Sequence, residues 1–204
     1  MPIVDSSNPI RKRSSKSLLS IIVIALCCGF FACSGCCFLT KFLFRPQVVN
    51  SPQGADEAAS RITSWSPPAN FVGKTGSTMD NAVLRLDVVR YEHQLGRGIL
   101  ILGQLNSKLY RVADPDPQLQ QLVEKLAHDL KKIDLDHRET RTLTIREAQA
   151  DFEIGRGEDR ATTTRFRQVV GHFQGKVDRA IVILQCEEAF ITDEEIDEFL
   201  KSIK

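Results

Sequence analysis

The sequence lacks an excess of either sign of charge, because its 204 residues contain 27 lysines and arginines and 26 aspartates and glutamates. This balance excludes a strongly basic nucleic-acid binder and a strongly acidic solvating tail. The charge is unevenly spread, however. Residues 1–45 contain six basic residues and one acidic residue, a net charge of +5. Residues 46–204 contain the other 21 basic and 25 acidic residues, a net charge of −4.

Cysteine is almost absent after residue 37. Five of the six cysteines lie in residues 27–37 and the sixth is Cys186, so no disulfide can form within residues 65–204. A nucleophilic thiol needs a base and an electropositive setting. Because the acidic Glu187 and Glu188 follow Cys186, we expect this thiol to be a strand residue in or near the core.

Catalytic and nucleotide-binding motifs are also missing. Neither G-x-S-x-G nor H-E-x-x-H occurs, and the Gly-Lys-Thr at residues 73–75 has Pro68 where a phosphate loop requires glycine. The four histidines do not have the spacing of a compact metal motif. The best local cluster is Asp134, Asp136 and His137, and it is typical of a solvated helix end. We therefore expect no catalytic residue, no metal site and no cofactor.

The sequence does contain one long apolar run, residues 18–39, which carries no charge. About 20 apolar residues at a rise of about 1.5 Å cross a hydrocarbon core of about 30 Å, so the run predicts one transmembrane helix, residues 18–44. A cleaved signal peptide is the alternative, but its apolar stretch is usually about 7–15 residues long. The small residues and cysteines of the run suit helix packing. Lipid attachment to Cys33 or Cys36 is the less favoured interpretation.

The flanking charges predict the orientation of this helix. Four basic residues precede the run and three follow it: Arg11, Lys12, Arg13 and Lys16, then Lys41, Arg45 and Arg61. The positive-inside rule therefore places residues 1–17, a basic tail, in the cytoplasm. The expected protein is a single-pass protein of the cell membrane with its C-terminal domain outside the cytoplasm. Residues 45–64 contain two prolines and no sustained apolar period, which predicts a linker with a short helical patch at 56–61.

Residues 65–204 alternate in a way that predicts an α+β domain. Apolar alternation predicts strands at residues 82–93, 98–105, 140–147, 149–155, 161–173 and 177–187. Turns are expected at 94–97 and at the glycines of 155–157 and 171–175. Apolar stripes predict helices at 117–133 and from Thr192 onward, where Thr192 and Glu195 form a capping box. The expected fold is an antiparallel sheet of about six strands covered by two helices.

Three arginines are the candidate binding residues. We expect Arg146, Arg165 and Arg167 to share the outer face of the sheet with Asp151 and Glu153. Cross-strand charge pairing on a solvated face is the ordinary explanation, and a partner-binding face is the sharper one. The mixed signs and the absence of interleaved aromatic residues argue against nucleic acid as the partner.

Three segments carry a resemblance to a known family. They are Trp65-Ser-Pro-Pro-Ala-Asn-Phe71, Gly171-His-Phe-Gln-Gly-Lys176 and the closing Phe199-Leu-Lys-Ser-Ile203. With these segments, residues 65–204 resemble PsbP-like α/β domains and uncharacterised bacterial membrane-anchored proteins of that kind. The resemblance implies the fold and a role as a non-enzymatic binding or assembly factor. It implies no catalytic or metal-ligating residue.

The sequence thus favours a non-catalytic binding or scaffolding module that is anchored in a lipid bilayer and has a membrane or extracytoplasmic protein partner. Two alternatives stay open. One is an enzyme whose site assembles only in three dimensions. The other is an accessory subunit of a membrane complex that assembles through its transmembrane helix.

Overall fold

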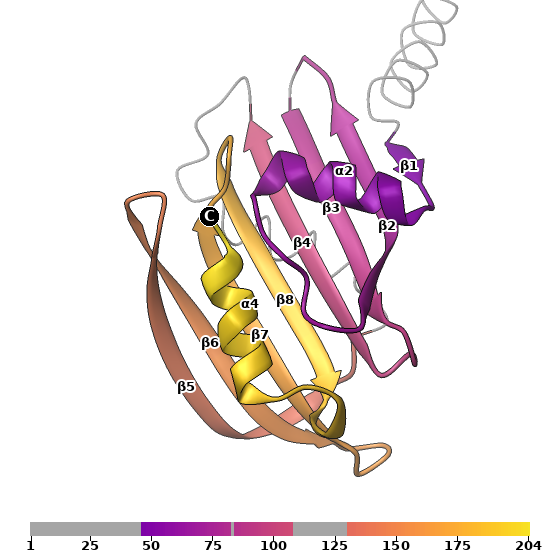
Figure 1. Ribbon diagram of the computed structural model, residues 1–204, viewed down its shortest axis with the longest axis vertical. Helices are drawn as coiled ribbons and strands as arrows, with labels where there is room; N and C mark the ends of the chain where they lie inside the picture. Colours follow the sequence, from indigo (N-terminus) through magenta and orange to yellow (C-terminus); the bar gives the residue numbers. More distant parts are fainter. Residues whose placement is uncertain (1–45, 83, 108–129) are drawn as a thin grey trace, which may run out of the picture. The chain divides into compact units, whose positions relative to one another are not determined.

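The computed structural model describes residues 46–82, 84–107 and 130–204, which all belong to one unit, Pro46–Lys204 (Figure 1). These residues form an α+β domain with an eight-stranded sheet and two α-helices. The elements in chain order are β1 (Gln47–Val49), α2 (Pro52–Ile62), β2 (Phe71–Asp80), β3 (Leu84–His93), β4 (Gly98–Ser107), β5 (Ile133–Ile145), β6 (Ala148–Asp159), β7 (Arg165–Gln174), β8 (Arg179–Glu187), the 3-10 helix η1 (Glu188–Phe190) and α4 (Asp193–Ser202).

The sheet consists of two runs of antiparallel hairpins that meet in the middle. Its strand order is β1-β2-β3-β4-β8-β7-β6-β5, and each neighbouring pair is antiparallel. The two runs join where β4 pairs with β8, with Leu102 opposite Val182. The first and last strands of the order, β1 and β5, are therefore the edges of the sheet. Both helices lie over the same face, α2 on β2–β4 and α4 on the second run (Figure 1).

Each face of the sheet has its own apolar cluster. The face under the helices, called the helical face below, holds the larger cluster, in which large side chains such as Tyr91, Phe152, Phe173 and Leu184 are almost fully buried. The opposite face holds a smaller cluster of Leu86, Val88, Ile101, Ile181 and Ile183. Apolar residues on both faces of β4 and β8 are what the continuous apolar sequences of these strands require.

Several expected elements are confirmed. The hairpin at residues 82–105 forms as β3 and β4. Phe152 and Ile154 point into the core, while Asp151 and Glu153 are exposed. The capping box at the start of α4 is also present. The Thr192 hydroxyl accepts from the backbone N–H of Glu195 at 3.1 Å, and the Glu195 carboxylate accepts from the Thr192 N–H at 2.8 Å.

The segment expected to be a linker, residues 45–64, belongs to the folded unit instead, and the helical patch expected at 56–61 is confirmed as part of a longer helix. The segment contains β1 and the helix α2, and the folded unit begins at Pro46 instead of near Trp65. Ser51 caps α2 by accepting from the N–H of Gly54 at 3.0 Å, and Pro52 occupies the first turn. The buried side of α2 consists mostly of alanine, with Ala55, Ala58, Ala59 and Ile62. Because alanine gives a weak hydropathy signal, the amphipathic pattern of this helix is hard to see in the sequence.

Three of the four glycines expected to mark turns lie inside strands, and only Gly175 lies in a turn. Gly155 and Gly157 belong to β6, which continues to Asp159, and Gly171 belongs to β7. A Cβ on Gly171 would come within 2.1 Å of the Phe152 ring, and one on Gly157 within 2.1 Å of the carbonyl oxygen of Asp134. These glycines are needed for close packing, and the real turns lie at residues 160–164 and 175–178.

The apolar run at residues 18–39 and most of the helix expected at 117–133 lie outside the described residues. The end of that helix is different from the expectation, because residues 130–132 are not helical and Ile133 begins β5. The buried Gln185 amide holds this end, accepting from the Lys131 N–H at 2.7 Å and donating to the Lys131 carbonyl at 3.0 Å. Among the described residues, no helix has the length and apolar character needed to cross a membrane.

Candidate functional site

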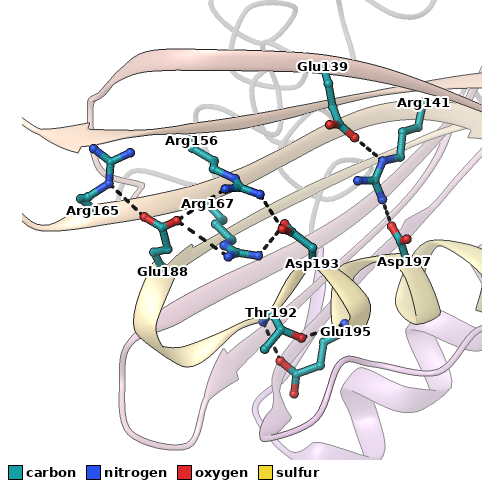
Figure 2. Close-up of polar contacts among 10 residues, drawn as sticks. All are labelled: Glu139, Arg141, Arg156, Arg165, Arg167, Glu188, Thr192, Asp193, Glu195 and Asp197. Carbon is teal, nitrogen blue, oxygen red and sulfur yellow. Dashed lines mark hydrogen bonds and ion pairs between the residues drawn. The ribbon is translucent and has the colours of Figure 1, made fainter.

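Two of the three arginines that the sequence marked as candidates, Arg165 and Arg167, are engaged with carboxylates of the same chain. Arg167 on β7 and Arg156 on β6 each donate to Asp193 at 2.5 Å, and Arg165 donates through Nε to Glu188 at 3.0 Å (Figure 2). Asp193 lies in the first turn of α4 and Glu188 in η1. This arginine–carboxylate cluster therefore connects two strands to the segment that leads into the last helix.

The cluster has a structural explanation. The Arg167 side chain is 13% exposed, which makes it one of the least accessible charges of the group. Arg165 also pairs with Asp136 of β5 at 3.0 Å, so three arginines face three carboxylates. Hydrogen bonds between charged groups are stronger than neutral ones and fix geometry. The cluster holds α4 in position over the second run of strands.

The five residues expected on one surface are divided between separate places. Arg146 occupies the turn between β5 and β6, where its φ is 50°, far along the strands from the other two arginines. Asp151 and Glu153 lie on the opposite face from Arg167, since Glu153 stands beside Val170 of the smaller apolar cluster. The alternation of a strand shows which of its residues share a face. It does not show which of the two faces the helices cover, because that depends on how the strand pairs in the sheet. Partner binding at Arg146, Arg165 and Arg167 stays a prediction.

The other groups considered from the sequence are also separated. Cys186 is buried, as expected, and burial together with the nearby Glu187 carboxylate raises the pKa of its thiol to about 12. Asp134 pairs with Arg160, whose hydrogen bond lowers the pKa of the carboxyl group, and Asp136 pairs with Arg165. In the described ranges, no group of three or more His, Cys, Asp or Glu residues could hold a metal ion.

A groove lies between the strap at residues 64–69 and α4. Its wider part has a volume of about 470 Å³ and is open to solvent, with Trp65, Glu198, Lys201 and Lys204 among its lining residues. A narrower part of about 140 Å³ continues along the prolines of the strap. The Trp65 ring stands edge-on to Tyr91 at 5.0 Å and to Phe199 at 5.8 Å. Sequence reasoning did not identify this groove, because it brings together segments that are far apart in the chain, such as Ser66 and Ser202, which are 136 residues apart.

The outer edge of β5 is the second feature that sequence reasoning did not identify. β5 is 13 residues long and is the last strand of the sheet, so its outer edge has no neighbouring strand in the described part of the chain. Residues 136–140, 142 and 144 are exposed. The other edge strand, β1, has only three residues. An edge strand presents unpaired N–H and C=O groups to which another strand can add.

Comparisons with known proteins do not assign the chain to a family. No family model and no curated protein matches it. Among solved structures, it is similar to LpqN of Mycobacterium tuberculosis, a protein involved in cell envelope biogenesis, with 10% identity, a TM-score of 0.27 and coverage of 78% of this chain and 79% of that one. It is also similar to protein CV1439 of Chromobacterium violaceum, with 13% identity, a TM-score of 0.18 and coverage of 78% and 90%. These TM-scores are too low to support any argument, and the resemblance to PsbP-like domains stays a prediction.

Proposed function

We propose that the protein is a membrane-anchored, non-catalytic binding module that pairs with another protein along the outer edge of β5. The observation that carries this proposal is the length and exposure of that edge, seven of whose residues from 136 to 144 are exposed. Strand addition at a sheet edge is a common way for proteins to bind each other, because the main-chain hydrogen bonds supply affinity and the side chains supply specificity.

The reactive groups of the described residues support a binding role over a catalytic one. The Cys186 thiol is buried and has a pKa of about 12, so little of it is thiolate at neutral pH. Arg165 and Arg167 are engaged in ion pairs that fix α4. The Tyr91 hydroxyl donates to Asp56 at 2.6 Å, and burial and this bond raise its pKa, so it keeps its proton. These groups are used to hold the fold together.

The anchor in this proposal is the uncharged run at residues 18–39. It would keep residues 1–17 in the cytoplasm and the domain outside the cell membrane. We expect the full chain to stay in the membrane fraction after carbonate washing, and a chain without residues 18–39 to become soluble. Recovery of the intact, uncut full chain in the aqueous fraction would contradict the anchor.

Photo-crosslinking in the native membrane tests the binding edge. A photoreactive amino acid replaces Thr140 in the middle of the exposed part of β5, and in a control variant it replaces Gln53, which is exposed on α2. We expect a discrete protein adduct from position 140 and none from position 53. The absence of an adduct at position 140, or the same adducts at both positions, would overturn the proposed binding edge.

A further inference from the structure

The charges along β5 point to a particular partner. Resting on the proposed function, we propose that the strand added at the outer edge of β5 is β5 of a second copy of this chain, antiparallel, with Thr140 opposite Thr140 of the second copy.

Symmetry limits the registers available to such a pair. A two-fold axis perpendicular to the sheet reverses the strand direction and keeps every side chain on its own face. Successive residues of a strand point to opposite faces. A residue can then stand opposite only a residue that points to the same face. An axis between two residues would place neighbours of opposite faces against each other, so the axis must pass through a residue. The irregularity between Leu135 and His137 ends the regular alternation, which leaves residues 137–145 for pairing.

The charged side chains select one of these registers. An axis at residue 138, 139 or 141 would put Arg138, Glu139 or Arg141 opposite its own copy, and like charges directly opposite each other are destabilising. An axis at residue 142 or beyond puts apolar residues or threonine opposite the charged ones. An axis at Thr140 places Glu139 opposite Arg141 of the second copy, and this pair occurs twice. It also places Thr140 opposite itself, a favourable cross-strand pair.

The two charged residues are already oriented at the edge. Glu139 and Arg141 lie on the helical face, where Arg141 donates to Glu139 and also pairs with Asp197 of α4 (Figure 2). Their side chains are 42% and 31% exposed. A guanidinium carries five N–H donors and a carboxylate accepts at two oxygens, so both groups have capacity for a partner in the second copy. On the opposite face, Thr140 is exposed.

The membrane anchor makes this pairing effective. Each exposed cross-strand pair contributes little by itself, so we expect weak association of dilute chains. Two chains anchored in one bilayer have a high effective concentration, which strengthens a weak contact without any additional bond. The proposal therefore concerns the full chain in a bilayer.

Disulfide crosslinking of the full chain in phospholipid vesicles tests the register. The five cysteines at residues 27–37 are replaced by alanine, and Cys186 is kept because it is buried. In Thr140→Cys chains the two Cα atoms would lie about 4.5–5.5 Å apart, within the range that a disulfide spans. In the control Thr144→Cys, on the same strand and face, they would be about 27 Å apart. We expect a disulfide dimer only from Thr140→Cys. Equal crosslinking of both variants, or no dimer from either, would overturn the proposal.

Charge reversal tests the pairing in the Thr140→Cys background. Glu139→Arg would place two arginines opposite each other twice, so we expect about tenfold less crosslinked dimer. The double variant Glu139→Arg with Arg141→Glu restores opposite charges and should restore the dimer. The control Arg138→Glu stands opposite Thr142 of the second copy and should leave the dimer unchanged. Loss of the dimer in the control, or no loss in Glu139→Arg, would overturn the register.

The identity of the photo-adduct at position 140 separates this proposal from the proposed function. A second copy of the chain supports both. A different protein, without a Thr140→Cys dimer, overturns pairing between copies and leaves the binding edge standing. No adduct and no disulfide dimer overturn both.

Discussion

The two helices cover the same face of the sheet in different ways. α2 approaches β2 closely, because glycine and alanine stand at the contact: a Cβ on Gly76 would lie 2.4 Å from the carbonyl oxygen of Gly54, and one on Gly73 would lie 2.7 Å from the Cβ of Ala55. α4 uses bulky side chains, with Ile196, Phe199 and Leu200 buried beneath it. It is also tied to the strands by the arginine–carboxylate cluster.

The difference shows that a helix can be held close to a sheet because the strand beneath it has glycines, which have no side chains. α4 has a wide stripe of large apolar residues and a capping box, which are strong signals in the sequence. The contact of α2 depends on the absence of side chains on the strand beneath it, where Gly73 and Gly76 leave room for the helix backbone. The Gly-Lys-Thr of residues 73–75 invites a phosphate-loop interpretation, but it belongs to β2. Its glycine is one of those that let α2 pack closely on this strand.

Removing bulk under α4 has the largest expected effect. Phe199 is 2% exposed and touches the Trp65 ring edge-on. Phe199→Ala should lower the free energy of unfolding by about 3–5 kcal/mol, because the buried ring is lost and a cavity remains. Urea unfolding of the full chain in detergent, followed by circular dichroism, measures the change. The control Leu95→Ala removes a side chain that is 68% exposed and should have almost no effect. Similar values for the two variants would contradict the role of Phe199.

Adding bulk under α2 has the next largest effect. Gly76→Ala forces the backbone of α2 away from β2, and such overpacking costs about 1–3 kcal/mol. The control Lys74→Ala lies on the same strand at an exposed position and adds no bulk under α2, and exposed substitutions usually change stability by less than about 0.5 kcal/mol. The same unfolding assay should show a clear loss for Gly76→Ala only. If Lys74→Ala were equally destabilising, close approach would not explain the glycine at residue 76.

Removing the cap of α4 has the smallest effect of the three. Thr192→Ala leaves the N–H of Glu195 without its acceptor and should cost about 1 kcal/mol. Thr192→Ser keeps the hydroxyl and should be close to the native protein in the unfolding assay. If Thr192→Ser lost as much stability as Thr192→Ala, the hydrogen bond would not be the source of the effect.

Much of the second run of strands could be predicted from the sequence, and β2 in the first run could not. The strands β5 to β8 have alternating residues such as Phe152 and Ile154, whose periodicity depends only on the local chain. β2 was not predicted, because Gly73, Thr75, Gly76 and Ser77 give it little apolar character. Its pairing with β3 supplies the order that its own sequence does not indicate.

The candidate sites were harder to predict than the fold. The sequence predicts carboxylate partners for Arg165 and Arg167, and this is confirmed. The partners are Glu188 and Asp193, however, instead of Asp151 and Glu153. Those partners lie in η1 and α4, and the local alternation of a strand contains no information about which helix will cover it. The outer edge of β5 depends on strand order, which is a property of the whole sheet.

The sequence by itself determined the α+β class, the hairpin of β3 and β4, the capping box of α4 and the buried position of Cys186. Each of these depends on local periodicity, on a hydrogen bond within one turn, or on the setting of one residue. Only the tertiary structure decided that the helix at residues 52–62 packs on the sheet, that Gly155, Gly157 and Gly171 serve packing, and that β5 is the last strand of the sheet in the described residues. These features depend on contacts between distant segments, where the space left by one chain segment is filled by another.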